Sequence, residues 1–176
     1  MAGSTVSGDI HPILKDDYAS EWMGIEVVAL DDGHATIRMT LRQEMLNGFG
    51  MAHGGMIFAF GDTAFALACN PTAPKPGEAR IDTDSITVAS GVDINFLKPA
   101  FRGQVLTAVA NRRASTGRSG LYDIQIYAAD PVAGSPTAAP AATARAATVP
   151  GELPTDILPG ELVAEFRGRS RTISKK

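Results

Sequence analysis

The sequence predicts an α+β fold in which a curled antiparallel sheet of about six strands wraps around one long hydrophobic helix. Residues 54–69 would place apolar side chains on every side of a helix, which is typical of a buried helix. Four strand-like segments follow this helix, and their succession favours an antiparallel sheet. Because one flat layer cannot cover such a helix on all sides, we expect the sheet to curl around it.

An amphipathic N-terminal helix is expected at residues 11–23. Its apolar positions recur every three or four residues, with charged side chains between them. These apolar positions are Ile13, Leu14, Tyr18 and Trp22. The helix should end at Gly24, because glycine adopts the backbone conformation that terminates helices.

The remaining elements are predicted to be strands. Residues 35–41 alternate apolar and polar side chains, and the dipeptide Asp32 and Gly33 supplies a turn from a preceding strand at 25–30. We therefore expect a hairpin with one buried face. The later strands are expected at residues 86–97, 104–114, 121–128 and 162–173.

The chain of 176 residues has the size of a single domain, which we place at residues 10–174. An apolar fraction of 44% supplies enough material for a core. Residues 1–9 are small and polar, and we expect a disordered tail there. Residues 129–161 are dominated by Ala and Pro without periodicity, which predicts an inserted loop.

Composition and charge argue against several classes of protein. A net charge of -3 argues against nucleic acid as the main partner. The single cysteine, Cys69, can form neither an internal disulfide nor a multi-cysteine zinc site, which fits a reducing cytoplasm. The longest apolar run is too short to span a membrane, and the N-terminus lacks the features of a signal peptide. We expect a cytoplasmic protein.

Familiar catalytic and metal-binding motifs are absent from the sequence. It contains no serine-hydrolase elbow, no phosphate loop and no dinucleotide fingerprint. The three histidines lie too far apart for a metal pair on one helix, so we expect no metal site. They are His11, His34 and His53.

The start of the long helix is the first candidate site. No Ser, Thr or Asp stands at the obvious N-cap position before Gly54 and Gly55, so the first N–H groups are expected to lack a side-chain acceptor. Such donors, at the positive end of a helix dipole and without side chains around them, are suited to an oxyanion hole. The alternative is that the two glycines simply permit tight packing or a kink.

Asp62, within the apolar helix, is the second candidate site. A buried carboxylate is unfavourable unless it is paired, so its presence needs a reason. It is either an internal cap or salt-bridge partner, or a general base or nucleophile whose basicity is raised by desolvation. Asp62 lies eight residues after Gly54, about 12 Å along a helix. If both residues are catalytic, they must act from two subunits of a dimer.

An ordered set of motifs resembles the hotdog-fold acyl-CoA thioesterases of the phenylacetate-degradation (PaaI) type. The resemblance covers nearly the whole chain from His11 to Ile173. The first motifs are Met-Leu-Asn-Gly at 45–48, Ala-His-Gly-Gly at 52–55, Gly-Asp-Thr-Ala-Phe-Ala at 61–66 and Ala-Cys-Asn at 68–70. The later ones are Val-Ala-Ser-Gly at 88–91, Asp-Ile-Asn-Phe-Leu-Lys-Pro-Ala at 93–100, Gly-Leu-Tyr-Asp-Ile at 120–124 and Phe-Arg-Gly-Arg-Ser at 166–170.

The resemblance implies a hotdog fold, dimers joined edge to edge and commonly a tetramer of two dimers. It also implies hydrolysis of an acyl-CoA, such as a (hydroxy)phenylacetyl-CoA, to free acid and CoA, with CoA as part of the substrate and no cofactor. Gly54 N–H would polarise the thioester carbonyl, and His53 would shape the same turn. Asp62 of the neighbouring subunit would act as nucleophile or base, and Asn47 would hold the nucleophile, water or thioester.

Further residues are candidates for substrate binding. Family members with Glu in place of Asp often carry a hydroxyl one turn later, where this chain has Ala66; Thr63 is the nearest substitute, although it faces away from Asp62. The full set of binding candidates is Gly55, Thr63, Ser90, Gly91, Lys98 and Arg118. For Asn47, which precedes Gly48, the alternative is a purely structural turn residue. The basic residues of 167–171 alternate as on a solvated strand face.

Two alternatives to thioester hydrolysis remain open at this point. The first is a hotdog module that binds acyl-CoA without hydrolysing it. The second is a hydratase acting on an enoyl-CoA, which would pair Asp62 with a nearby histidine, for which His53 is the only candidate.

Overall fold

A computed structural model describes residues 8, 10–70, 84–131 and 160–175 of the chain. The tail expected at residues 1–9 therefore lies outside the described residues, apart from Gly8. So does most of the insertion expected at 129–161. In the described residues, no helix is long and apolar enough to cross a membrane.

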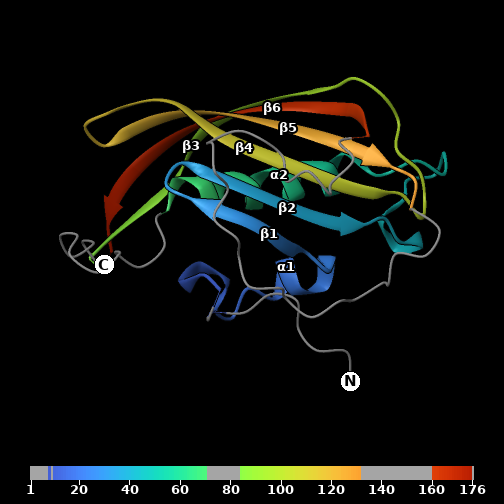
Figure 1. Cartoon of the computed structure of the whole chain (residues 1–176), viewed down its shortest axis with the longest axis horizontal. Coiled ribbons are helices and arrows are strands. Elements are labelled where there is room, and N and C mark those ends of the chain that lie inside the picture. Colours follow the sequence, from blue (N-terminus) through green and yellow to red (C-terminus); the bar gives the residue numbers. More distant parts are fainter. Residues whose placement is uncertain (1–7, 9, 71–83, 132–159, 176) are drawn as a thin grey trace.

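Six antiparallel strands form one sheet in the order β1-β2-β4-β5-β6-β3, and Figure 1 shows it curled over helix α2 (Gly54–Cys69). The predicted fold class is confirmed, and the strand ends differ from the expected ones by one or two residues. The strands are β1 (Glu26–Asp31), β2 (His34–Thr40), β3 (Ser85–Phe96), β4 (Val105–Thr116), β5 (Ser119–Ala129) and β6 (Glu161–Ser174). The turn between β1 and β2 uses Gly33 with φ 75°, as the turn dipeptide predicted.

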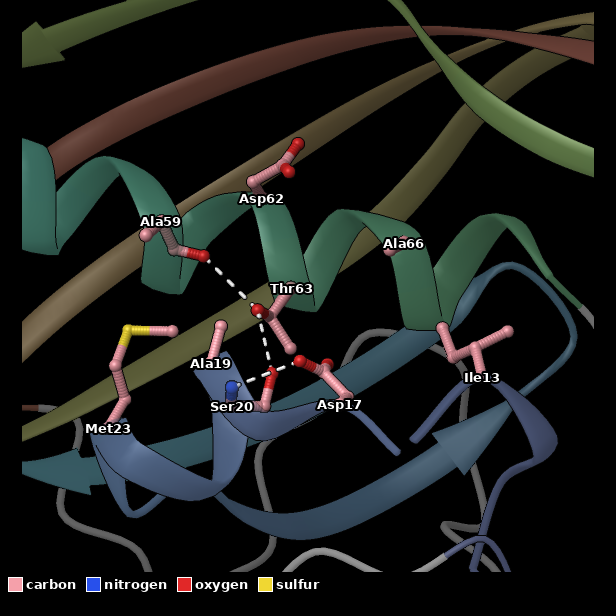
Figure 2. Close-up of a pocket in the computed structure, with 9 residues that line it drawn as sticks. All are labelled: Ile13, Asp17, Ala19, Ser20, Met23, Ala59, Asp62, Thr63 and Ala66. Atoms are coloured by element: carbon pink, nitrogen blue, oxygen red, sulfur yellow. Dashed lines mark hydrogen bonds between the residues drawn. The ribbon is translucent and has the colours of Figure 1, made fainter. Parts of the chain in front are cut away.

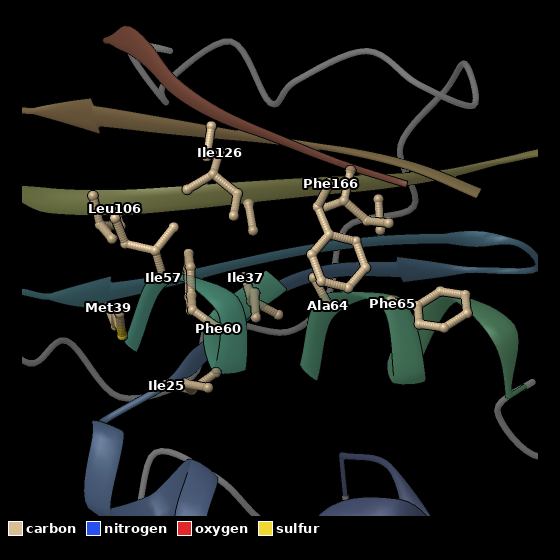
Figure 3. Packing of buried hydrophobic residues seen from close by; sticks show 14 of the residues in the cluster. Ile25, Ile37, Met39, Ile57, Phe60, Ala64, Phe65, Leu106, Ile126 and Phe166 are labelled. Carbon is tan, nitrogen blue, oxygen red and sulfur yellow. The ribbon is translucent and has the colours of Figure 1, made fainter. Parts of the chain in front are cut away.

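Helix α2 packs into the concave side of the sheet. Two glycines permit the close approach, Gly61 in the helix and Gly168 in β6. A Cβ at Gly168 of β6 would lie 2.8 Å from the ring of Phe65, and one at Gly61 would lie 3.1 Å from the ring of Phe166. Gly168 has no room for a side chain, and at Gly61 the Phe166 ring would have to shift to admit one. Figure 3 shows the resulting core, in which Phe60, Phe65 and Phe166 are fully buried among aliphatic side chains of the strands.

The N-terminal segment differs from the single helix predicted for residues 11–23. It forms a 3-10 turn, η1 (Pro12–Leu14), and a short helix, α1 (Tyr18–Met23). Between them Asp16 adopts φ 60°, and Asp17 begins α1 by accepting a hydrogen bond from the N–H of Ser20 at 3.1 Å. Two aspartates that favour caps and turns therefore interrupt the helical pattern.

The face that α1 buries also differs from the predicted one. Tyr18 and Trp22, expected on the apolar face, are 73% and 51% exposed, while Ser20 and Met23 are buried. The break at Asp16 resets the helical phase, so the spacing counted from Ile13 no longer applies. The predicted end of the helix is confirmed, because Gly24 is the C-cap with φ 69°.

The sheet has two edges, β1 and β3. Strand β3 pairs only with β6 among the described residues, and most of its residues are half-exposed or exposed. Its C-terminal end lies next to the start of α2, where Ala52 N–H donates to the carbonyl of Ala100 at 2.8 Å. This open edge and the start of the central helix therefore belong to the same region of the molecule.

Candidate active site

The start of α2 is capped by a histidine. His53 Nδ1 accepts a hydrogen bond from the N–H of Gly55 at 3.0 Å, and His53 N–H donates to the carbonyl of Met45 at 2.8 Å. The expectation that no side chain accepts from the first turn was wrong, because an imidazole nitrogen serves as the acceptor. Gly54 N–H still donates to no acceptor among the described residues. One helix N-terminal donor is thus left for a ligand.

The loop before α2 is held together by Asn47. Its Oδ1 accepts from the N–H groups of Phe49 at 2.9 Å and Met51 at 3.2 Å, and its own N–H donates to the carbonyl of Met51 at 2.8 Å. The side-chain oxygen of Asn47 therefore stabilises the turn, which is the structural role considered as the alternative for this residue. Its Nδ2 donates to no described residue, so the amide N–H groups remain for a second purpose.

Asp62 lies in the middle of α2 and is half-buried. Burial raises the pKa of its carboxyl above the usual value, and no described residue donates a hydrogen bond to it. The internal cap and the salt bridge considered for this residue are both absent from the described part of the chain. Burial raises the pKa of the Cys69 thiol to about 12, and the negative charge of Asp62 contributes to this rise. A carboxylate of this kind is a stronger base than an ordinary aspartate.

A cavity of about 260 Å³ lies between α1 and α2, and Asp62 is among the residues that line it. Figure 2 shows Thr63 directed into it and Asp62 directed to the other side of the helix. Thr63 Oγ1 donates to the carbonyl of Ala59 at 3.2 Å and lies 3.3 Å from Oγ of Ser20. The expectation that Thr63 faces away from Asp62 is confirmed, and its hydroxyl joins the two helices.

Ser90 and Gly91 form a bulge on β3. The register with β6 shifts between Ala89 and Gly91, as the glycine suggested. Ser90 Oγ donates to the carbonyl of Arg169 at 2.9 Å. A Cβ at Gly91 would lie 2.9 Å from the Arg169 guanidinium, which pairs with Asp93 at 2.6 Å. The close approach at this glycine is therefore made by an arginine of the same chain.

The two basic candidates lie far apart. Lys98 follows β3 and pairs with Glu161 at the start of β6, whereas Arg118 lies in the exposed β4–β5 turn beside the other end of β6. Lys98 N–H donates to the carbonyl of Val163, and Thr172 N–H donates to the carbonyl of Arg118, so the two contacts on β6 are nine residues apart, roughly 30 Å along a strand. One chain does not bring Lys98 and Arg118 to the same ligand phosphate.

The arginines of β6 lie on an exposed face, as their alternation predicted. Arg167 pairs with Asp123 at 2.7 Å, and both Arg167 and Arg169 are exposed. Among the described residues, no group of three or more His, Cys, Asp or Glu side chains is placed to hold a metal ion.

Two residues that sequence reasoning missed lie beside the candidates. The Phe96 ring is next to Gly54, and Ser20 bonds to Thr63. Alternation along β3 was a usable signal for Phe96, since Ile94 and Phe96 share the side of the strand that faces α2. No sequence signal pointed to Ser20, because its burial follows from the break before α1.

Fold and site together define the class of protein: a hotdog fold, with a glycine at the start of the central helix and a carboxylate within it. A model of the Thioesterase superfamily matches residues 49–135. The chain is 40% identical over 116 residues to the acyl-coenzyme A thioesterase PaaI of Escherichia coli. The matched segment covers 66% of this chain and 75% of that protein. It belongs to the hotdog-fold acyl-CoA thioesterases of the PaaI type.

Solved structures agree with this assignment. The PaaI protein from the phenylacetic acid degradation operon of Escherichia coli superimposes with a TM-score of 0.68 at 30% identity, covering 95% of this chain and 92% of that one. A conserved protein from Pseudomonas aeruginosa gives a TM-score of 0.61 at 21% identity, covering 98% and 100%, and shows the same fold.

Proposed function

We propose that the protein hydrolyses an aryl-CoA thioester, of the phenylacetyl-CoA or hydroxyphenylacetyl-CoA kind, to the free acid and CoA. Its membership of the PaaI-type acyl-CoA thioesterases supports thioester hydrolysis, and the operon of the Escherichia coli relative supports the aryl group. The observation that carries the proposal is the half-buried carboxylate of Asp62, which has a raised pKa and no hydrogen-bond donor among the described residues.

In the proposed reaction the thioester carbonyl oxygen accepts a hydrogen bond from Gly54 N–H. The backbone donor and the dipole of α2 would stabilise the negative charge that develops on this oxygen during attack. His53 fixes the donor by closing the first turn through Gly55 N–H. Loss of one such donor typically lowers the rate on the order of 10² to 10³.

Asp62 serves as base or as nucleophile. As base it takes a proton from water, the hydroxide oxygen bonds to the carbonyl carbon, and the carbon–sulfur bond breaks to release the CoA thiolate. As nucleophile its carboxylate bonds to the same carbon and expels the thiolate, and water then hydrolyses the anhydride. In either route we assign the Nδ2 amide of Asn47 to holding the attacking water or the thioester.

The site is proposed to form between two subunits. Gly54 and Asp62 of one chain lie about 12 Å apart along α2, too far for both to act on one carbonyl. The open edge of β3 and the start of α2 lie in one region, together with exposed apolar side chains. These side chains are Phe49, Phe96, Leu97 and Phe101. We propose a dimer through this region, and a tetramer of two such dimers.

The remaining candidates are assigned to substrate binding. Gly55, Ser90 and Gly91 would lie along the pantetheine arm, and Thr63 would contribute by anchoring α1 beside Asp62. Lys98 of one chain and Arg118 of another would meet the CoA phosphates, since one chain separates them. CoA enters as part of the substrate, and the proposed steps call on no cofactor.

The test is release of free thiol from a panel of CoA esters. We expect the wild-type protein to release thiol from aryl-CoA esters faster than from acetyl-CoA, and Asp62→Asn to lose about 10² or more in kcat, because the amide can neither accept the proton nor attack. A folded Asp62→Asn variant with wild-type turnover would overturn the assignment of Asp62. Loss of the enoyl chromophore without thiol release would indicate a hydratase, and binding without either reaction a non-catalytic module.

A further inference from the structure

We propose that Phe96 is a positioning residue whose ring shields the Gly54 N–H from water, so that this donor is held unhydrated for the thioester carbonyl. The inference rests on the proposed function of Gly54 and extends it to a side chain that lies 42 positions further along the chain and on another element. The contact between the glycine and the ring carries it.

The ring of Phe96 is directed at Gly54. A Cβ built on Gly54 would lie 3.1 Å from Cζ of Phe96 and 3.5 and 3.6 Å from its two Cε atoms, so the tip of the ring faces the glycine. These three ring atoms are the nearest neighbours that such a Cβ would meet. Gly54 therefore has no side chain at the point where the aromatic ring approaches the first turn of α2.

The backbone on both sides of this contact is fixed. Phe96 ends β3 in register with Ala164, and the next residue, Leu97, donates its N–H to the carbonyl of Val163 at 2.8 Å. On the other side, Ala52 N–H donates to Ala100 O at 2.8 Å. The segment that follows Phe96 is thus hydrogen-bonded both to β6 and to the loop that leads into α2.

Within a single chain the ring remains 53% exposed, although Phe is among the residues that proteins usually bury. From the approach of the ring to the first turn of α2, we infer that it covers one side of the Gly54 donor and leaves the other side open to a ligand. A donor without a partner is otherwise hydrated, and a carbonyl must displace that water before it can bind. A hydrogen bond to developing charge is also stronger where water is excluded.

The variants are Phe96→Ala, which removes the ring, Phe96→Leu, which keeps an apolar side chain, and Tyr18→Ala as matched control. Tyr18 is an exposed aromatic side chain on α1, outside the proposed dimer region. We expect Phe96→Ala to lower kcat about tenfold, less than loss of the donor itself, with KM little changed, and Phe96→Leu to fall between. Tyr18→Ala should keep kcat within about twofold of wild type.

A second measurement does not depend on turnover. Hydrogen–deuterium exchange at the Gly54 amide, followed by NMR in the full-length protein, should be faster in Phe96→Ala than in wild type and unchanged in Tyr18→Ala. Unchanged exchange in Phe96→Ala, or a raised KM with unchanged kcat, would overturn the proposal. If Phe96→Ala fails to fold, the same criteria apply to Phe96→Leu.

The failure of this inference and that of the proposed function are distinguishable. A wild-type protein that releases no thiol from any CoA ester would contradict the proposed function, whatever the exchange rate at Gly54. A wild-type protein that hydrolyses aryl-CoA while Phe96→Ala keeps full kcat and slow exchange would contradict the role of Phe96 alone.

Discussion

At the scale of single residues, the site is defined by polar groups that the chain itself leaves unused. Asn47 commits its oxygen to the loop and keeps its amide N–H groups. His53 uses one ring nitrogen for Gly55, and Gly54 N–H stays unpaired among the described residues. Asp62 has no described donor. The side-chain groups among them are not buried away from water, so water hydrates them in the free protein and a ligand can replace that water.

The raised pKa of Asp62 predicts opposite effects of pH on activity and stability. The base or nucleophile must be ionised, so kcat/KM should fall as pH falls through the raised pKa, and this limb should be absent from the residual rate of Asp62→Asn. The folded protein, in contrast, is destabilised by the buried charge once pH exceeds the usual carboxyl pKa.

Asp62→Asn should therefore raise the Tm at neutral pH and leave it unchanged in acid, where the carboxyl is protonated in both the folded and the unfolded states. Thermal denaturation from pH 3 to 8 measures this directly. A Tm difference that is largest in acid would contradict desolvation as the cause of the shift.

At the scale of elements, the joint between α1 and α2 is the hydrogen bond between Ser20 and Thr63. The Ser20 hydroxyl is in a side chain that is only 1% exposed, so it depends on Thr63, whereas Thr63 has a second partner in the Ala59 carbonyl. The two ends of the contact are therefore not equivalent. Removing Thr63 leaves a buried hydroxyl unpaired, and removing Ser20 does not.

Thr63→Val is accordingly expected to lower the free energy of unfolding by about 1 to 2 kcal/mol, and Ser20→Ala by less. The double variant should be more stable than Thr63→Val alone, because it lacks the unpaired hydroxyl. Urea denaturation of the three variants provides the measurement. Equal losses for the two single variants would show that the joint is not organised in this way.

Elements differ in how far the sequence predicted them. Helix α2 was predicted at both ends, since only Asp62 and Thr63 interrupt its run of apolar and small residues from Gly54 to Cys69. The N-terminal helix was predicted too long because Asp16 and Asp17 favour local turn and cap geometry over the helical pattern. Within the site, the residue types of Asn47 and Asp62 were readable, but the His53 cap and the Phe96 contact depend on side-chain directions, which spacing does not supply.

At the scale of the whole molecule, the proposed active site needs two chains. Helix α2 places its donor at one end and its carboxylate in the middle, and the open edge of β3 borders the same region. A two-fold axis would bring the start of one α2 toward the middle of the other. In a homodimer, a substitution of either residue therefore alters both sites. Each site loses the substituted residue and keeps the other one.

Two inactive variants should consequently restore each other. Gly54→Pro deletes the donor, and proline is favoured at the first position of a helix, where His53 already has the extended backbone that must precede it. A side chain there first meets the half-exposed Phe96, which can turn aside. Co-expressed at equal levels with Asp62→Asn, Gly54→Pro should give about a quarter of wild-type activity, since half the dimers are mixed and each holds one intact site.

Purification of the mixed dimer through two different tags, followed by the thiol-release assay, measures this restoration. Each variant expressed alone is the control and should stay inactive. A mixed dimer as inactive as its parents would place both residues of a site on the same chain.

The open edge of β3 also has a consequence for how the protein behaves as a solution is diluted. A strand of 12 residues, paired on one side only in the described chain, leaves backbone donors and acceptors facing outward. If a second copy satisfies them, mass action links folding to association, and the thermal midpoint rises with the total protein concentration. Enzyme concentration then sets not only how much catalyst is present but what fraction of it exists in catalytic form.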